Sequence, residues 1–294
     1  MNTITDTNPT LSLCPSLPVA IPDDFDADKI IASGQCFRCT RLADGTWRFL
    51  TQAGSPGRTH ILVLRQLSPT EYAASCSAEE WAQIWTPYFD LDCSYQSIRD
   101  RVREDSFLSA AAEFGKGIRI LRQDPWETLI CFILSQRKSI PSIRNSVERL
   151  SERFGSPVQT DGGELRSFPT PEALRDADTE ALVACGLGYR LPYVRDAAER
   201  FCRTPDLALQ WRLLGNEDLL AALKQIHGVG NKIANCVMLF AYHRSSCAPI
   251  DTWIERIIEK EYGGCNPFPA YGEDAGILQQ YAFFYAQRHK EDFR

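Results

Sequence analysis

A lysine and an aspartate stand nineteen residues apart in a segment that also contains a Gly-Val-Gly turn. Lys232 follows Gly228, Val229 and Gly230 in the first turn of a predicted helix, and Asp251 follows a Pro-Ile pair. An activated lysine amine is a nucleophile that forms Schiff bases with carbonyl-type carbons. An aspartate at the start of the next predicted helix is also a natural N-cap, so capping is the alternative role for Asp251. The pair predicts covalent catalysis by an amine assisted by a carboxylate.

The Gly-Val-Gly turn joins two predicted helices, at 217–226 and 231–243. Glycines permit positive φ and let the backbone approach a ligand closely. The amides of such a turn, together with the N-terminus of the next helix, form an anion site. A plain turn between two helices is the alternative, and it needs one glycine. We interpret the unit as a helix-hairpin-helix that holds phosphate without a large basic surface.

The composition is that of a folded protein. The chain has 294 residues, of which 44% are hydrophobic and 24% charged, and this length suits two domains. The net charge of −6 argues against a broadly basic nucleic-acid surface, although a local site built from backbone dipoles remains open. We see no signal peptide and no apolar run long enough for a membrane span. We therefore expect an intracellular protein, in the nucleus of a eukaryote or the cytoplasm and nucleoid of a bacterium.

Eleven cysteines are scattered along the chain, and only Cys36 and Cys39 have C-x-x-C spacing. A structural zinc needs four ligands, and no second C-x-x-C or C-x-x-H completes such a site. The βαβ context of a redox motif is also missing. We expect buried, reduced thiols, with metal or redox chemistry at Cys36 and Cys39 as the alternative.

The predicted architecture is α+β. Strand signals at 46–51 and 59–67 predict an antiparallel sheet with flanking helices, and helical periodicity dominates from about residue 120. In "DPWETLICFILS", Asp124 is a predicted N-cap and Pro125 takes the first helical position. The expected divisions are a loose N-terminal lead (1–22), a β-rich domain (23–120) and an all-helical domain (121–294). The helical domain contains the helix-hairpin-helix (217–243) and the catalytic aspartate loop (244–251).

Five separated segments occur in the order found in one known family. They are "SGQCFR" (33–38), "RQDPWETLICFILS" (122–135), "GLGYR" (186–190), the hairpin with its lysine, and the Pro-Ile-Asp. The chain resembles the base-excision DNA glycosylases with a helix-hairpin-helix, and most closely the 8-oxoguanine DNA glycosylase/lyases, from about residue 30 to 287. In this resemblance Lys232 and Asp251 match the catalytic pair.

The resemblance implies a base pocket. Gly34 would offer its carbonyl to the N7–H that 8-oxoguanine has and guanine lacks. Cys236 and Phe283 would sandwich the extruded base, and Gln279 would hydrogen-bond its Watson–Crick edge. The spacing agrees, because Cys236 shares a helix face with Lys232, and Gln279 and Phe283 are four residues apart on the last predicted helix. Taken singly, each of these residues is also compatible with a place in the core.

The resemblance also implies contacts to the duplex. Tyr189 and Arg190 would enter the space that the flipped nucleotide leaves. Arg137 stands where the family has an asparagine facing the orphaned cytosine, and Ser142 where its eukaryotic members have an arginine. The remaining DNA-binding residues would be the hairpin's His227, Gly228, Val229 and Gly230, and Trp253, with His227 and Trp253 replacing a proline and a histidine of the family. The departures leave the opposite-base preference open.

We predict an enzyme that excises 8-oxoguanine and related oxidised purines from double-stranded DNA and cleaves the abasic strand through a lysine Schiff base. It would act as a monomer without a required cofactor, and the backbone carbonyls of Lys224, Ile226 and Val229 could hold a structural monovalent or divalent cation. One alternative is an alkyl-base DNA glycosylase, which activates water with the aspartate and needs no lysine. Another is a non-enzymatic DNA-binding module that uses the hairpin as a phosphate clamp.

Overall fold

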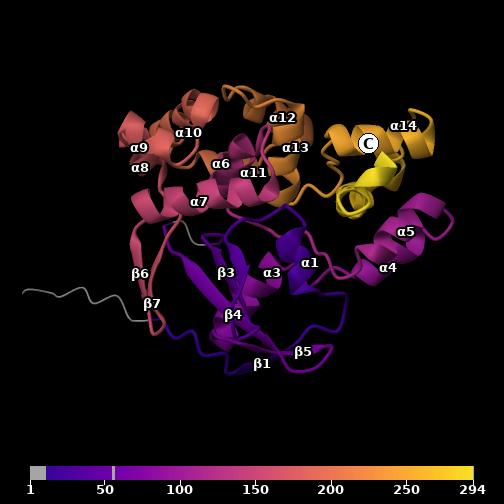
Figure 1. The fold of residues 1–294 in the computed structure, drawn as a ribbon, viewed down its shortest axis with the longest axis horizontal. Coiled ribbons are helices and arrows are strands. Elements are labelled where there is room, and N and C mark those ends of the chain that lie inside the picture. The colour runs from indigo at the N-terminus through magenta and orange to yellow at the C-terminus, as the bar shows by residue number, and fades with distance from the viewer. Residues whose placement is uncertain (1–10, 55–56, 294) are drawn as a thin grey trace, which may run out of the picture.

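The structure is a computed structural model that describes residues 11–54 and 57–293. An antiparallel sheet lies at one end, and helices cover it and extend away from it (Figure 1). None of the described helices is both long and apolar enough to cross a bilayer.

The sheet has five antiparallel strands in the order β1-β5-β4-β3-β2. Trp47 pairs with Leu64 and Phe49 with Leu62, so the alternate residues of β3 and β4 put large apolar side chains on one face. This face packs on Trp85 and the other apolar residues of the segment at 78–88. The strands are β1 Leu17–Ala20, β2 Cys39–Arg41, β3 Trp47–Thr51, β4 His60–Gln66 and β5 Glu71–Ala74.

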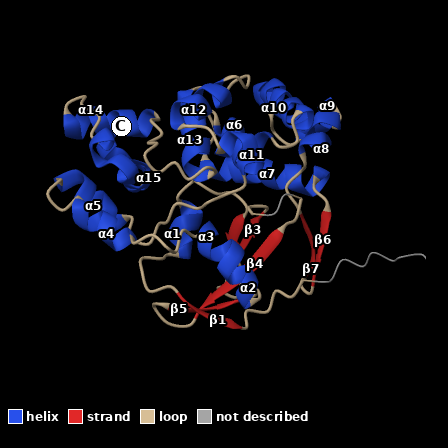
Figure 2. Ribbon diagram, turned by 180° about the vertical axis from the view of Figure 1, so that it is seen from behind, coloured by secondary structure: helices blue, strands red, loops and turns tan. Residues whose placement is uncertain are grey.

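Short helices flank the sheet, and longer ones build the rest of the molecule (Figure 2). The N-terminal helices are α1 Ala27–Ala32, α2 Ala78–Glu80, the π-helix η1 Trp81–Trp85, α3 Thr86–Tyr88, α4 Tyr95–Arg101 and α5 Ser106–Phe114. The helices that follow are α6 Pro125–Ser135, α7 Ile140–Phe154, α8 Pro171–Asp176, α9 Thr179–Ala184, η2 Gly188–Arg190, α10 Leu191–Arg203, α11 Leu207–Arg212, α12 Asn216–Lys224, α13 Asn231–Phe240, α14 Thr252–Tyr262, η3 Phe268–Asp274, α15 Ala275–Ala286 and η4 Lys290–Phe293.

The local signals that predicted α6 are present in the structure. The Asp124 carboxylate accepts the Glu127 amide at 2.8 Å, and Pro125 occupies the first helical position. Eight of the eleven residues of this helix are buried, from Trp126 to Leu134. An N-cap and a continuous apolar run therefore place α6 at the centre of the helical core.

The α+β class is confirmed, and three details differ from the prediction. Residues 17–20 of the predicted loose lead form β1, paired with β5, while residues 1–10 of that lead lie outside the described residues. A two-stranded hairpin, β6 Pro157–Thr160 and β7 Gly163–Arg166, interrupts the otherwise helical part. Both were missed because each strand has four residues, too few to show a clear alternation.

The third difference concerns the predicted boundary at residue 120. Helices α4 and α5 precede it in sequence, yet their apolar faces belong to the same core cluster as α6, α13 and α15. Helix α5 packs directly on α15. The N-terminal region therefore contributes to both cores, because amphipathic helices bury their apolar faces against whichever element is adjacent.

Candidate active site

Helix α13 positions the predicted nucleophile. Gly230 is its N-cap, Lys232 stands in its first turn and Cys236 lies one turn further on, buried at 3% exposure. The Lys232 ammonium is 5.2 Å from the centroid of the Phe132 ring on α6, a cation–π distance. Burial raises the pKa of the Cys236 thiol to about 11, and the neighbouring Lys232 opposes part of that rise. Cys236 is thus a neutral thiol beside an amine.

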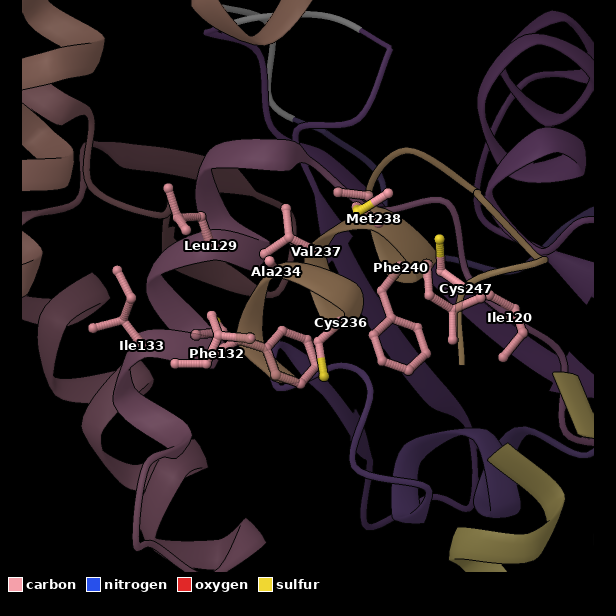
Figure 3. Packing of buried hydrophobic residues seen from close by; sticks show 14 of the residues in the cluster. Ile120, Leu129, Phe132, Ile133, Ala234, Cys236, Val237, Met238, Phe240 and Cys247 are labelled. Atoms are coloured by element: carbon pink, nitrogen blue, oxygen red, sulfur yellow. The ribbon is translucent and has the colours of Figure 1, made fainter. Parts of the chain in front are cut away.

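The residues behind α13 form a tightly packed wall. Phe132 and Phe240 stack with ring centroids 5.4 Å apart and planes 10° from parallel. Figure 3 shows Cys236 in the same cluster as these two rings. An apolar wall of this kind removes rotamer freedom from the residues that project from it. Lys232 therefore projects from a rigid support.

Asp251 is the N-cap of α14, which is one of the two roles predicted for it; the other is assistance to Lys232. Its Oδ1 accepts the amide protons of Trp253 and Ile254, each at 3.0 Å. Among the described residues, Oδ2 takes no hydrogen bond, and Asp251 also lines the cleft that contains Lys232. Capping fixes the carboxylate and leaves one oxygen for chemistry, so the two roles are compatible.

A cleft of about 1260 Å³ brings together residues from six α-helices, the 3₁₀ helix η4 and the loops between them. Eight residues selected from the sequence line it, and they come from positions as far apart as 34 and 283: Gly34, Arg137, Lys232, Cys236, Asp251, Trp253, Gln279 and Phe283. Tyr189, Arg190 and the four hairpin residues lie outside its lining. The predicted site residues thus fall into two groups, one lining the open cleft and the other on the adjoining loops.

The turn at Gly34 requires glycine. Its φ of +80° is in the left-handed region, and a Cβ there would lie 2.8 Å from the Ile140 side chain and 3.6 Å from the Phe283 ring. Gln279 on α15 is 4% exposed, and its Oε1 is buried with no hydrogen-bond partner among the described residues. An orphaned buried amide oxygen in a cavity is a position prepared for a ligand donor.

Gln280, the neighbour of Gln279, was not selected from the sequence. Its amide donates to the Ser33 carbonyl at 2.8 Å, across 247 residues of chain, and so ties α15 to the turn that contains Gly34. The only signal in the sequence is a second glutamine in an otherwise apolar helix. A buried glutamine usually has a hydrogen-bond partner, and the sequence does not identify the partner of Gln280.

One of the two hairpin glycines has a left-handed backbone conformation. Gly228 has φ +80°, and a Cβ on it would lie 2.4 Å from the ring of Tyr193. Gly230 has φ −97° and open space where a Cβ would be. His227 stacks edge-on against Tyr193 at 4.6 Å and donates its amide proton to Asp196 at 2.8 Å. Tyr193 on α10 is therefore a second support that the sequence did not reveal.

The plug loop, residues 186–190, presents its two predicted DNA-binding side chains differently. Tyr189 is 50% exposed, whereas Arg190 is 6% exposed. The Arg190 guanidinium lies over the Tyr189 ring at 4.3 Å and donates to the carbonyls of Leu187 and Gln136. Arg190 must leave this position to enter a duplex, so its predicted contact with DNA requires a rearrangement.

The turn between α6 and α7, residues 136–138, contains the remaining predicted DNA-binding residue. Arg137 has φ +52°, which is uncommon for a residue other than glycine, and its side chain is exposed at the cleft. Ser142 is also exposed, on the first turn of α7. A strained backbone that presents a long cation to the solvent points to a binding role.

Cys36 and Cys39 are both buried, with their Sγ atoms 3.0 Å apart. Hydrogen bonding to Cys39 and burial raise the pKa of the Cys36 thiol well above its ordinary value. In the described part of the chain, no group of three or more His, Cys, Asp or Glu side chains is placed to hold a metal ion. The pair contributes to the core beneath the sheet.

Two family models together match residues 18–273. The model described as "8-oxoguanine DNA glycosylase, N-terminal domain" matches residues 18–129. The model described as "HhH-GPD superfamily base excision DNA repair protein" matches residues 130–273. The two matches are contiguous and leave out residues 1–17 and 274–294, so helix α15 with Gln279 and Phe283 lies outside them.

Individual proteins give the same result. The N-glycosylase/DNA lyase of Saccharomyces cerevisiae is 36% identical over 187 residues, which cover 60% of this chain and 50% of that protein. This chain therefore matches about half the length of the yeast relative. The structure of MBOgg1 in complex with a low affinity DNA ligand has a TM-score of 0.85 and 32% identity, covering 94% of this chain and 97% of that one.

A bacterial structure is also similar. It is the 8-oxoguanine glycosylase/lyase of Clostridium acetobutylicum in complex with double-stranded DNA that has cytosine opposite 8-oxoG, with a TM-score of 0.83 and 27% identity over 94% of this chain and 99% of that one. Each of the two structures covers 94% of this chain. The chain belongs to the 8-oxoguanine DNA glycosylase family of the HhH-GPD superfamily.

Proposed function

We propose that this protein is a bifunctional enzyme that excises 8-oxoguanine, and related oxidised purines, from double-stranded DNA and then cleaves the abasic strand. The observation that carries the proposal is the position of Lys232, on a rigid apolar wall inside a cleft that Asp251 also lines. The lysine distinguishes this chemistry from direct attack by water. The comparisons support the same activity through relatives whose names include glycosylase and lyase.

The damaged nucleotide leaves the duplex and enters the cleft, because its glycosidic bond is out of reach inside the stack. Cys236 and Phe283 hold the two faces of the base, and Gln279 binds its Watson–Crick edge through the Oε1 that lacks a partner. The Gly34 carbonyl accepts the N7–H that distinguishes 8-oxoguanine from guanine. The Cys236–Phe283 sandwich makes binding depend on the shape of the base. The Gln279 and Gly34 contacts make it depend on where the base carries protons.

The chemical step proceeds at C1′ of the flipped nucleotide. The Lys232 amine forms a bond to C1′ as the bond from C1′ to the base nitrogen breaks, and the base leaves with that electron pair and takes up a proton. Asp251 stabilises the positive charge that develops on the sugar and accepts the lysine proton. Ring opening gives a Schiff base, and loss of a C2′ proton then expels the 3′ phosphate with its bonding electrons.

The duplex is held outside the cleft. The amides of the hairpin at 227–230 bind phosphate, and Trp253, Tyr189 and Arg137 contact the DNA next to the lesion. The cation site formed by the Lys224, Ile226 and Val229 carbonyls belongs to this proposal. The Ile226 carbonyl accepts the Val229 amide proton at 3.0 Å. This hydrogen bond uses one lone pair of the oxygen and leaves the second for a cation, provided that the turn keeps this geometry. The proposed enzyme is an intracellular monomer without a required cofactor.

The alkyl-base alternative leaves Lys232 without a task, because that chemistry needs the aspartate alone. A non-enzymatic clamp leaves both Lys232 and Asp251 unexplained. The assay is release of free base and strand cleavage from an 8-oxoguanine duplex by the wild type, Lys232→Gln and Asp251→Asn. Both variants should lose about 10²–10⁴-fold in rate, the range for removal of a group that transfers protons or stabilises charge. Full activity of Lys232→Gln would support the alkyl-base alternative, and no turnover by the wild type would support the clamp.

A further inference from the structure

Three loops that carry the proposed DNA contacts are joined by hydrogen bonds to one another. They are the α6–α7 turn (136–138), the plug loop (186–190) and the hairpin (227–230). The Gln136 side-chain amide donates to the Gly228 carbonyl at 3.3 Å and to the Ile133 carbonyl at 3.2 Å. Its own backbone carbonyl accepts from Arg190 and, at 3.5 Å, from the Tyr189 hydroxyl. The α6–α7 turn is therefore the centre of the arrangement.

Lys138 makes the second connection between the α6–α7 turn and the plug loop. Its ammonium donates to the Gly186 carbonyl at 2.6 Å and to the hydroxyl of the buried Ser146 on α7 at 2.7 Å. Gly186 has φ +83° and begins the plug loop. Hydrogen bonds from a charged donor are shorter and stronger than neutral ones, and both of these are short. Lys138 thus fixes the start of the plug loop.

The electrostatic setting of Lys138 is unfavourable without a counter-charge. No carboxylate forms an ion pair with Lys138, Arg137 or Arg190 in the described part of the chain. Burial, and then the positive charges of Arg190 and Arg149, lower the pKa of the Lys138 ammonium. A half-buried cation next to other cations is retained where its hydrogen bonds, or an incoming anion such as DNA phosphate, offset the repulsion.

The two cations that hold the plug loop differ in how easily they can be released. Arg190 is itself a proposed DNA contact, so its bond to the Gln136 carbonyl must break when the duplex is bound. Lys138 donates to acceptors inside the protein, and although it lines the cleft it is not one of the groups proposed to act on the base or the sugar. When Arg190 leaves, the 2.6 Å bond from Lys138 to Gly186 and the long 3.5 Å bond from the Tyr189 hydroxyl to Gln136 are the side-chain hydrogen bonds between the plug loop and the α6–α7 turn that remain among the described residues.

We propose that Lys138 is a positioning residue for base extrusion: it fixes Gly186 so that exposed Tyr189 and Arg137 face the duplex together while Arg190 exchanges from protein to DNA. The inference rests on the proposed function, because it assigns to Lys138 the placement of the loop that fills the gap left by a flipped base. A role in extrusion affects removal of a stacked base and not cleavage at an abasic site, which has no base to unstack.

The test compares Lys138→Met with Arg149→Met. Both changes remove one positive charge, but among the described residues exposed Arg149 donates only to the Ala184 carbonyl, at the long distance of 3.4 Å. Single-turnover excision of 8-oxoguanine should slow at least about tenfold in Lys138→Met, the size expected for loss of a hydrogen bond from a charged donor. Cleavage of a ready-made abasic site should change less than about twofold, and Arg149→Met should keep both rates within about twofold.

A second measurement does not depend on activity. Amide hydrogen exchange in 186–190 of the DNA-free protein should become faster in Lys138→Met and stay unchanged in Arg149→Met. If Lys138→Met does not fold, Ser146→Ala removes one of the two acceptors and should give the same pattern with a smaller effect.

Equal loss of the excision rate and the abasic-site cleavage rate, or an unchanged excision rate, overturns the proposal for Lys138. If the wild type excises nothing, the proposed function fails instead, and unchanged exchange in 186–190 would then overturn the positioning role separately.

Discussion

The Arg190 guanidinium donates to the Gln136 carbonyl and leaves only 6% of the arginine exposed, next to Arg137, whose side chain is exposed. The arginine that the family resemblance assigned to the duplex is therefore covered in the DNA-free protein. The arginine at the family's asparagine position is the one that reaches the solvent. The burial of Arg190 and the exposure of Arg137 together affect how the orphaned base is recognised.

We predict that excision depends only weakly on the base opposite the lesion, within about tenfold across the four bases. Cytosine is singled out when fixed donors meet its O2 and N3, and a long, exposed arginine can also reach acceptors on thymine or a purine. Ser142 is too short to replace the missing second arginine. A kinetic series on the four duplexes measures this, and a preference for cytosine of a hundredfold or more would show that Arg137 reads cytosine.

The base pocket can be tested apart from the nucleophile. Phe283→Ala loses a stacking face worth about 1–3 kcal/mol, and Gln279→Ala loses the contacts to the edge of the base. Both variants keep Lys232, so they should excise 8-oxoguanine poorly yet still nick a ready-made abasic site. Comparing the two substrates in the same assay is the measurement. Equal losses on both would place these residues outside the base pocket.

The two hairpin glycines should respond differently to alanine. In Gly228→Ala the new Cβ meets the Tyr193 ring at 2.4 Å and the backbone stays at φ +80°, which together should cost about 1–3 kcal/mol or more. Gly230→Ala has open space and an ordinary φ, so it is the matched control. Thermal unfolding measures both. Equal melting temperatures for the two variants would contradict the described contact.

Glu127 should make stability depend on pH. Burial raises the pKa of its carboxyl to about 7, although nearby Arg38 opposes the rise, and its buried Oε2 has no hydrogen-bond partner among the described residues. The folded state therefore binds more protons than the unfolded state between about pH 4.5 and 7, so stability falls as the pH rises through that window. The loss is at most about 3 kcal/mol. Glu127→Gln should remove this part of the slope, as denaturant unfolding at pH 5 and pH 8 would measure; an unchanged slope would contradict it.

Local signals predicted the elements that matter most for the cleft. Asp124 and Pro125 started α6, the apolar periodicity set its length, and the glycines marked the hairpin before α13. Those signals are strong because they depend on neighbours in sequence. Strand β1 was missed because it has four residues and depends on pairing with β5, more than fifty residues away. The hairpin β6/β7 was missed because its four-residue strands are too short to show a clear alternation.

The residues of the site also fall into two groups, those that the sequence identified and those that only the structure reveals. The family resemblance identified Lys232, Asp251 and the pocket residues, and the structure brings them into one cleft. Gln136, Lys138, Tyr193 and Gln280 could not be found from the sequence, because each acts through a hydrogen bond or ring contact with a residue more than thirty positions away. Nothing in their local sequence distinguishes such residues from ordinary surface or core positions.

The most direct test of the account is reductive trapping of the covalent intermediate. Borohydride converts a Schiff base between the lysine and C1′ into a stable amine, so the protein and the DNA migrate as one species. We predict that the wild type gives this adduct on a duplex with 8-oxoguanine and that Lys232→Gln gives none. Absence of an adduct with the wild type, or formation of one by Lys232→Gln, would contradict the central claim that Lys232 is the nucleophile.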